Sequence, residues 1–116
     1  ETAMAYTAMQ NAAGNWVQPS AETFQAAAAT ADWPSAQDFN LVITNAAGAD
    51  AWPISATVFV MMYKQPKNAK RAQDAIDFFT WALENGQPQA DQLHYVPLPP
   101  ALVEQVEAYW AAEFKL

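Results

Sequence analysis

The sequence predicts an α/β fold that is incomplete on its own. Segments with a helical apolar period surround one run, residues 55–63 (SATVFVMMY), that is rich in β-branched and aromatic residues. This run is apolar on both faces, which is typical of a central strand covered by helices on each side. The rest of the chain offers few strands that could pair with it. We therefore expect helices packed on a partial mixed sheet, in a chain that is a mature product or a fragment.

The first thirty residues contain one clear helix signal and one weaker one. Propensity favours a helix over residues 2–12, which Gly14 could end in a left-handed conformation. Residues 15–18 read as a short extended piece. Ser20 is a good N-cap, so we expect a second helix over residues 21–29.

The next segment is irregular. Pro34 biases Trp33 away from helical geometry, so the helix ends before it. A short turn through residue 39 follows, then a strand or turn at 41–43 and a glycine-containing loop at 45–50. Pro53 has no amide donor and therefore suits the start of the predicted strand rather than its middle.

The second half contains the strongest helical pattern. Asn68 is placed to cap a helix over residues 69–85, whose apolar residues recur at i, i+3 and i+4, and Gly86 would close it. A loop is expected over residues 87–92. The last helix is predicted over residues 101–113, with Pro100 in its first turn, where the missing amide is not needed.

Composition excludes several classes of function. The 116 residues suit about one domain, and twelve acidic against five basic residues give a net charge of −7. This charge argues against general attraction to nucleic acid or to anionic membranes. No cysteine and a single histidine, His94, exclude disulfides, thiol chemistry and multi-histidine metal sites. No apolar run approaches the ~20 residues of a membrane span, so membrane insertion is not expected. We also expect no cofactor and no metal.

The candidate catalytic groups have simpler structural explanations. Asp74 with Asp77, and Glu104 with Glu107, are three apart and share a helix face, as paired acid–base carboxylates could. Both pairs fall on polar faces, so we expect solvated side chains. His94 has no visible nucleophile or acid beside it and is expected at or near the surface. We therefore predict that the chain is not an enzyme.

Two further groups could bind ligands. The bases Lys64, Lys67, Lys70 and Arg71 could meet phosphate or an acidic partner, but no glycine-rich phosphate loop accompanies them, and a solubilising patch is expected. The tryptophans could stack on sugars, although core packing is the better interpretation. The segment around Trp52 is the exception to watch, because it joins a loop to the predicted strand.

The order of several motifs resembles the later part of the periplasmic phosphate-binding proteins of ABC transporters. The matching segments are 20–24 (SAETF), 31–33 (ADW), 48–54 (GADAWPI), 55–59 (SATVF), 78–82 (FFTWA) with 85–86 (NG), and 98–106 (LPPALVEQV) with Trp110. A looser match covers residues 5–6 and 10–11. The resemblance thus extends over nearly the whole chain.

The resemblance implies a two-lobe receptor of the class II type, located in the periplasm. Such a protein closes on inorganic phosphate by hinge bending and delivers it to a membrane permease. Residues 1–48 would end the second lobe, 49–55 would cross the hinge, and 56–116 would complete the first lobe. The expected hinge residues are Ala51, Trp52, Pro53, Ile54 and Ser55.

The resemblance carries no phosphate-binding residue into this segment. The family's anion-binding motifs, including an Arg-x-x-x-Ser-Gly-Thr loop, lie earlier in its sequence and are not found here. The segment would therefore supply scaffold: a strand, covering helices and part of the hinge. The alternative is a stand-alone acidic module that binds a basic partner and no small ligand.

Overall fold

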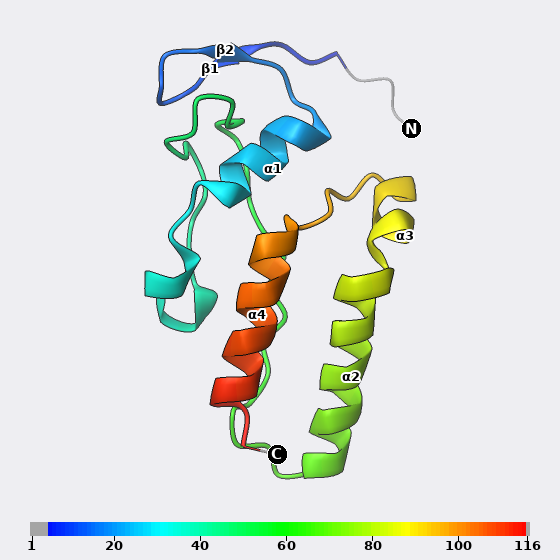
Figure 1. Ribbon diagram of the computed structural model, residues 1–116. Coiled ribbons are helices and arrows are strands. Elements are labelled where there is room, and N and C mark those ends of the chain that lie inside the picture. Colours follow the sequence, from blue (N-terminus) through cyan, green and yellow to red (C-terminus); the bar gives the residue numbers. More distant parts are fainter. Residues whose placement is uncertain (1–4, 116) are drawn as a thin grey trace. The chain divides into compact units, whose positions relative to one another are not determined.

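The computed structural model describes residues 5–115, in two compact units that divide between Thr57 and Val58 (Figure 1). The described residues are mostly helical, with one small two-stranded sheet. No helix within them is long and apolar enough to cross a membrane.

The first unit begins with a hairpin. Strand β1 (Met9–Gln10) pairs antiparallel with β2 (Trp16–Val17). The amide of Asn11 donates to the carbonyl of Asn15, and the amide of Gly14 donates to the carbonyl of Asn11. Gly14 has a φ of 84°, the left-handed geometry that a three-residue hairpin loop places before its second strand. The predicted helix over 2–12 is therefore wrong for its described residues, while the extended piece at 15–18 is confirmed around β2.

Helix α1 (Ala21–Ala29) follows the hairpin and has the predicted bounds. Ser20 caps it: the amide of Thr23 donates to the Ser20 hydroxyl at 3.3 Å, and the Ser20 amide donates to the Thr23 hydroxyl at 3.0 Å. This reciprocal pair satisfies two amides that the first helical turn leaves without partners. Two short 3₁₀ turns, η1 (Trp33–Ser35) and η2 (Gln37–Phe39), occupy the predicted irregular segment. Residues 41–43 form no strand.

The core of the first unit collects around α1. Its buried apolar residues are Val17, Ala27, Ala28, Trp33, Ile43, Ala51 and Trp52. The indole of Trp33 donates to the carbonyl of Ala28 at 2.7 Å, and its ring stacks on Phe39 at 6.2 Å. The indole is therefore buried with its polar atom satisfied, the arrangement that makes tryptophan a good core residue.

The second unit contains three helices. Helix α2 (Ala69–Asn85) is capped by Asn68, whose side chain accepts from the amide of Arg71, and it ends at Gly86 as predicted. Helix α4 (Pro100–Glu113) begins with its proline in the first turn and runs antiparallel to α2 (Figure 1). Helix α3 (Gln87–Gln92) corrects the predicted loop, since Pro88 lies in its first turn, where proline is well tolerated.

The predicted strand over residues 55–63 is wrong as an element of this structure. Among residues 5–115 it forms no ladder with any segment, and the only sheet is the hairpin. Its large apolar side chains are exposed: Val58 by 85%, Met61 by 95% and Tyr63 by 85%. A strand exists only when a neighbour accepts its backbone hydrogen bonds, and no described segment does so. The expected packing of helices on a mixed sheet is therefore absent here.

Candidate functional site

The predicted hinge residues form a tightly bonded segment at the end of the first unit. Ala51, Trp52 and Ser55 are 0%, 7% and 4% exposed, Pro53 is buried, and Ile54 is 61% exposed. The amide of Trp52 donates to the carbonyl of Thr23 at 2.9 Å. The segment is thus anchored to the first turn of α1.

Further hydrogen bonds join residues 53 and 55 to residues 44 and 45, and Ser55 to Trp52. The carbonyl of Pro53 accepts from the amide of Asn45 at 2.8 Å. The Ser55 hydroxyl donates to the carbonyl of Trp52 at 2.9 Å, and the Thr44 hydroxyl donates to the carbonyl of Ser55 at 3.3 Å. Buried hydrogen bonds of this kind resist local rotation of the backbone. The unit boundary lies two residues beyond Ser55, and the hinge assignment stays a prediction.

Asn11 fastens the hairpin to the loop that precedes the hinge residues, and sequence reasoning missed this role. Its side chain is 6% exposed overall, and Nδ2 donates to the carbonyls of Gly48, Ala49 and Ala51 at 3.3, 2.7 and 3.2 Å. Its Oδ1 accepts from the amides of Ala13 and Asn15. An asparagine followed by a glycine three residues later is a turn signal. No sequence pattern marks residues 48–51, about forty residues away, as the partners of this asparagine.

Close packing around Gly48 also holds the loop that precedes the predicted hinge residues. A Cβ on Gly48 would lie 2.7 Å from Cγ2 of Thr30 and 3.3 Å from Cβ of Ala51. The ring of Trp52 meets Phe24 edge-to-face, with centroids 6.3 Å apart. The segment around Trp52 is therefore core scaffold in its contacts, as the packing interpretation of the tryptophans expects. The same holds for Trp33, whereas Trp81 is 53% exposed.

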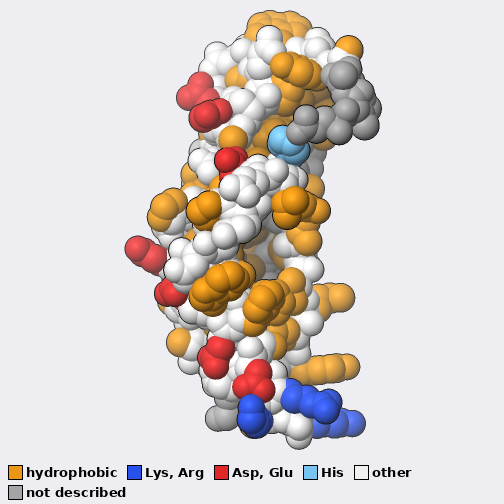
Figure 2. Space-filling model, turned by 90° about the vertical axis from the view of Figure 1, so that its right-hand side faces the viewer, with side chains coloured by type: hydrophobic (Ala, Val, Ile, Leu, Met, Phe, Trp, Pro, Cys, Tyr) orange, Lys and Arg blue, Asp and Glu red, His pale blue; other side chains and the backbone are white. Residues whose placement is uncertain are grey.

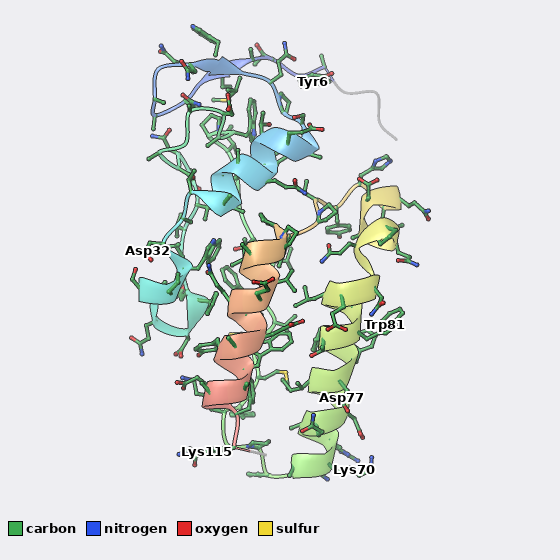
Figure 3. All side chains as sticks on the ribbon, viewed as in Figure 1. Tyr6, Asp32, Lys70, Asp77, Trp81 and Lys115 are labelled. Carbon is green, nitrogen blue, oxygen red and sulfur yellow. The ribbon has the colours of Figure 1, made fainter. Side chains whose placement is uncertain are left out.

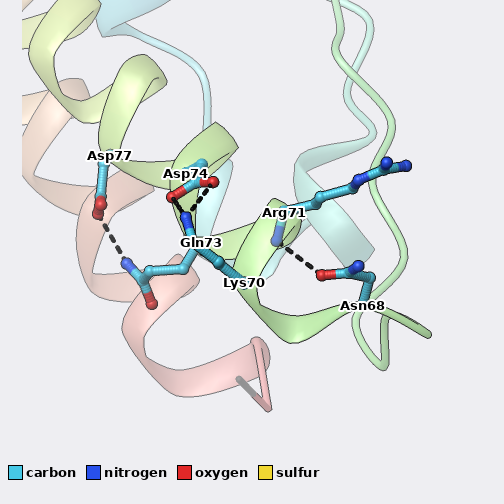
Figure 4. Close-up of polar contacts among 6 residues, drawn as sticks. All are labelled: Asn68, Lys70, Arg71, Gln73, Asp74 and Asp77. Atoms are coloured by element: carbon cyan, nitrogen blue, oxygen red, sulfur yellow. Dashed lines mark hydrogen bonds and ion pairs between the residues drawn. The ribbon is translucent and has the colours of Figure 1, made fainter.

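The carboxylate pairs do not converge into an acid–base site. Asp74 accepts from Lys70, and Asp77 accepts from the side-chain amide of Gln73 at 2.7 Å, all on the exposed face of α2 (Figure 4). The solvated interpretation of this pair is confirmed. Glu104 is exposed, while Glu107 is half-buried and its Oε1 has no hydrogen-bond partner.

Glu104 and Glu107 lie on a groove of the second unit that Glu84 also borders. Apolar residues of α2, α4 and the preceding loop complete its lining: Leu83, Leu98, Pro100 and Val103. No group of three or more residues of the types that bind metals comes together within residues 5–115. The groove therefore offers like-charged carboxylates on an apolar floor, without the cation or base that a catalytic pair would use.

His94 lies just after helix α3 and takes part in ending it. It has a φ of 61°, and its amide donates to the carbonyl of Asp91, while the amide of Tyr95 donates to the carbonyl of Ala90. These bonds satisfy the last carbonyls of the helix through a residue in the left-handed region. His94 is exposed, as the sequence predicts.

Glu22, at the start of α1, has a perturbed pKa. The pKa of Glu22 is lowered, first by a hydrogen bond from the Ser20 side chain and second by its own backbone amide. Both donors favour the ionised carboxylate at a helix N-terminus. The perturbation thus belongs to the helix cap.

The basic residues gather at one end of the second unit, around the start of α2 and the end of α4 (Figures 2 and 3). Lys64 pairs with Glu113 at 2.7 Å and lies 5.5 Å from the ring centroid of Tyr109. The amide of Lys115 donates to the carbonyl of Lys64, which brings the fifth base of the chain to the other four. We call these five residues, Lys64, Lys67, Lys70, Arg71 and Lys115, the basic end.

Comparison with known proteins gives strong sequence similarity to phosphate-binding proteins. No family model matches the chain. It is 67% identical over 112 residues to the phosphate-binding protein PstS of Xylella fastidiosa (strain 9a5c), which is 97% of this chain and 31% of that protein. The PstS proteins of Pasteurella multocida and Haemophilus influenzae are 40% and 38% identical over the same share of this chain, or 33% and 34% of their own.

The chain spans about a third of the length of these relatives. Identity of 67% over 97% of this chain cannot arise from similar composition alone. The second unit of the same chain exposes an apolar segment, residues 58–63, that pairs with no strand among the described residues. The resemblance of this chain to the phosphate-binding proteins of ABC transporters is thereby confirmed.

Proposed function

We propose that this chain is the C-terminal scaffold segment of a periplasmic protein that binds inorganic phosphate and delivers it to the permease of an ABC transporter. The observation that carries the proposal is the 67% identity over 97% of the chain to proteins named for phosphate binding. In this proposal residues 1–48 end one lobe, residues 49–55 cross to the other, and residues 56–116 complete it.

The exposed segment 58–63 supports the scaffold role. Val58, Val60, Met61 and Tyr63 are between 61% and 95% exposed, which leaves both an apolar surface and a row of backbone groups without a ladder. Monomeric proteins avoid such unprotected edges because they promote aggregation. A strand from the remaining two thirds of the receptor would pair with this segment and cover it.

The hinge remains part of the proposal in a specific form. Residues 51–55 are anchored to α1 and to residues 44 and 45 by hydrogen bonds, so rotation within them would break several contacts. Ala56 and Thr57 follow directly, at the unit boundary. Residues 49–55 would therefore cross between the lobes as an anchored segment, and lobe closure would bend the chain at the far end of this segment, just after Ser55.

Phosphate calorimetry tests the proposal on two proteins. The intact receptor that carries this segment should bind inorganic phosphate, whereas the isolated 116 residues should show no micromolar affinity, because the anion-binding residues lie elsewhere. Micromolar binding by the isolated chain would refute the scaffold role. An intact receptor without phosphate affinity would refute the function itself.

A stand-alone acidic interaction module is the second candidate, supported by the net charge of −7. Thermal melting with size-exclusion chromatography separates the two candidates. A module should melt sharply as a monomer, while an isolated scaffold segment should associate through residues 58–63. Met61→Lys should reduce that association yet destabilise the intact receptor, whereas Lys67→Gln, on an exposed polar position, should do neither.

A further inference from the structure

All five cations of the chain lie in the basic end, within a chain that is otherwise acidic. The first unit contains five acidic residues and no lysine or arginine. The second unit contains seven acidic residues and the five bases, which makes its net charge −2. Figure 2 shows the Lys and Arg side chains gathered together, with acidic side chains directly beside them.

The fold brings this cluster together from three separate segments. Lys64 and Lys67 precede α2, Lys70 and Arg71 lie in its first turn, and Lys115 follows α4. A hydrogen bond of 3.1 Å from the amide of Lys115 to the carbonyl of Lys64 joins the third segment to the first. In the sequence only Lys64, Lys67, Lys70 and Arg71 are near one another, and the fold adds Lys115.

Folding does not explain these charges. The N-terminus of a helix carries a partial positive charge, so Lys70 and Arg71 in the first turn of α2 weaken the helix. Lys70 offsets this through Asp74 at 2.9 Å, but the Arg71 guanidinium extends away from its neighbours (Figure 4). Neither Arg71 nor Lys67 makes an ion pair with a residue between 5 and 115. Residues that break a local folding rule without a structural gain are expected at functional surfaces.

The charge balance indicates the chemistry of the partner. Glu113 and Asp74 each pair with one lysine, so among residues 5–115 three of the five positive charges of the basic end have no ion-pair partner. Burial of these charges against apolar residues would be very costly, so the rest of a longer protein would leave them in solvent. A broad anionic membrane would also face the acidic residues around the cluster and be repelled. A protein surface with a few carboxylates can meet the cluster alone.

We propose that the basic end is a docking surface for a carboxylate-rich region of a partner protein. This inference rests on the proposed function, in which the partner is the membrane permease. Charge pairs of this kind steer association and fix the orientation of a complex, and they make both depend on salt.

The test measures docking of the intact receptor to its permease in nanodiscs made from neutral lipid. The variant Lys67→Gln/Arg71→Gln should raise the Kd about tenfold and reduce its dependence on salt. The matched control Gln92→Glu/Gln105→Glu makes the same change in net charge at exposed positions on α3 and α4, and should change the Kd less than about twofold. Phosphate calorimetry on both variants should match the unmodified protein.

Two docking results would overturn the inference while leaving phosphate binding intact. One is an equal effect of both double variants, which would show that only net charge matters. The other is binding of the unmodified receptor to permease-free vesicles with anionic lipid, lost in the Lys67/Arg71 variant, which would identify a membrane surface. Absence of phosphate binding by the unmodified receptor would refute the proposed function, and the permease assignment with it.

Discussion

Asn11 should contribute more to stability than any other polar side chain of the first unit. It is 6% exposed, and its side chain takes part in five hydrogen bonds of 2.7 to 3.3 Å. Three of them join the hairpin to residues 48–51, and two lie within the hairpin. Alanine at this position would remove the partner of the buried Ala51 carbonyl and of the Ala13 and Asn15 amides. The carbonyls of Gly48 and Ala49 would keep hydrogen bonds from the Ala51 amide and from Nδ2 of Asn15. At about 0.5–1.5 kcal/mol for each net bond, with a further cost for unsatisfied buried groups, Asn11→Ala should lower the free energy of unfolding by about 2–4 kcal/mol.

Urea unfolding followed by tryptophan fluorescence measures this loss, because Trp33 and Trp52 of the same unit are 4% and 7% exposed. The midpoint should fall while the dependence on urea stays constant. Asn15→Ala is the matched control: its Nδ2 donates one exposed bond to Ala49, so about 1 kcal/mol or less should be lost. Equal losses of unfolding free energy in Asn11→Ala and Asn15→Ala would show that the hydrogen bonds of the Asn11 side chain do not hold the first unit together.

Three further changes test the packing and the cap of the first unit. Gly48→Ala should destabilise by roughly 1–3 kcal/mol, because its Cβ would lie 2.7 Å from Cγ2 of Thr30; an unchanged melting temperature would mean that the loop around Gly48 has room. Trp33→Phe should cost about 1–3 kcal/mol, measured by urea unfolding, because a buried carbonyl of α1 loses the indole donor; a neutral result would indicate that water replaces it. Ser20→Ala should remove about 1 kcal/mol with the helix cap and raise the pKa of Glu22 toward its ordinary value, seen by NMR titration. Because the folded-state pKa of Glu22 is lowered, its contribution is present above its unfolded pKa and is lost as pH falls through the folded pKa, so the Ser20 variant should show a weaker loss in acid.

The elements that the sequence predicted well are those whose signals are local. Helix α1 has the expected bounds because Ser20 and Thr23 exchange hydrogen bonds within one turn, and α2 has them because Asn68 and Gly86 mark its ends. Helix α3 replaces the loop expected over residues 87–92, because Pro88 suits the first turn of a helix. In these cases the information lies within a few residues.

The elements that failed depend on distant partners. The β-branched run at 55–63 has strand propensity, but propensity cannot supply the second strand, and the described chain contains none for it. Alanine and methionine favour a helix before residue 12, yet Asn11 gains five hydrogen bonds in a hairpin whose partners are up to forty residues away. The candidate site was obscured for the same reason, since neither Asn11 nor the approach of Lys115 to Lys64 follows from neighbouring residues.

The two units differ in how far their own residues can bury them, and this difference bears on the proposed function. Seven of the nine buried apolar residues between 5 and 115 belong to the first unit, while the second contributes only Ala72 and Leu102. Yet the second unit has the longest helix and many large apolar side chains, among them Phe78 and Met61, which are 59% and 95% exposed. Burial of each such side chain stabilises a fold by about 1.5–3 kcal/mol. A sequence that leaves several of them at the surface therefore suits a larger core than the second unit forms by itself. The relatives are about three times as long as this chain, so in the proposed scaffold role the other two thirds of such a protein would supply that larger core.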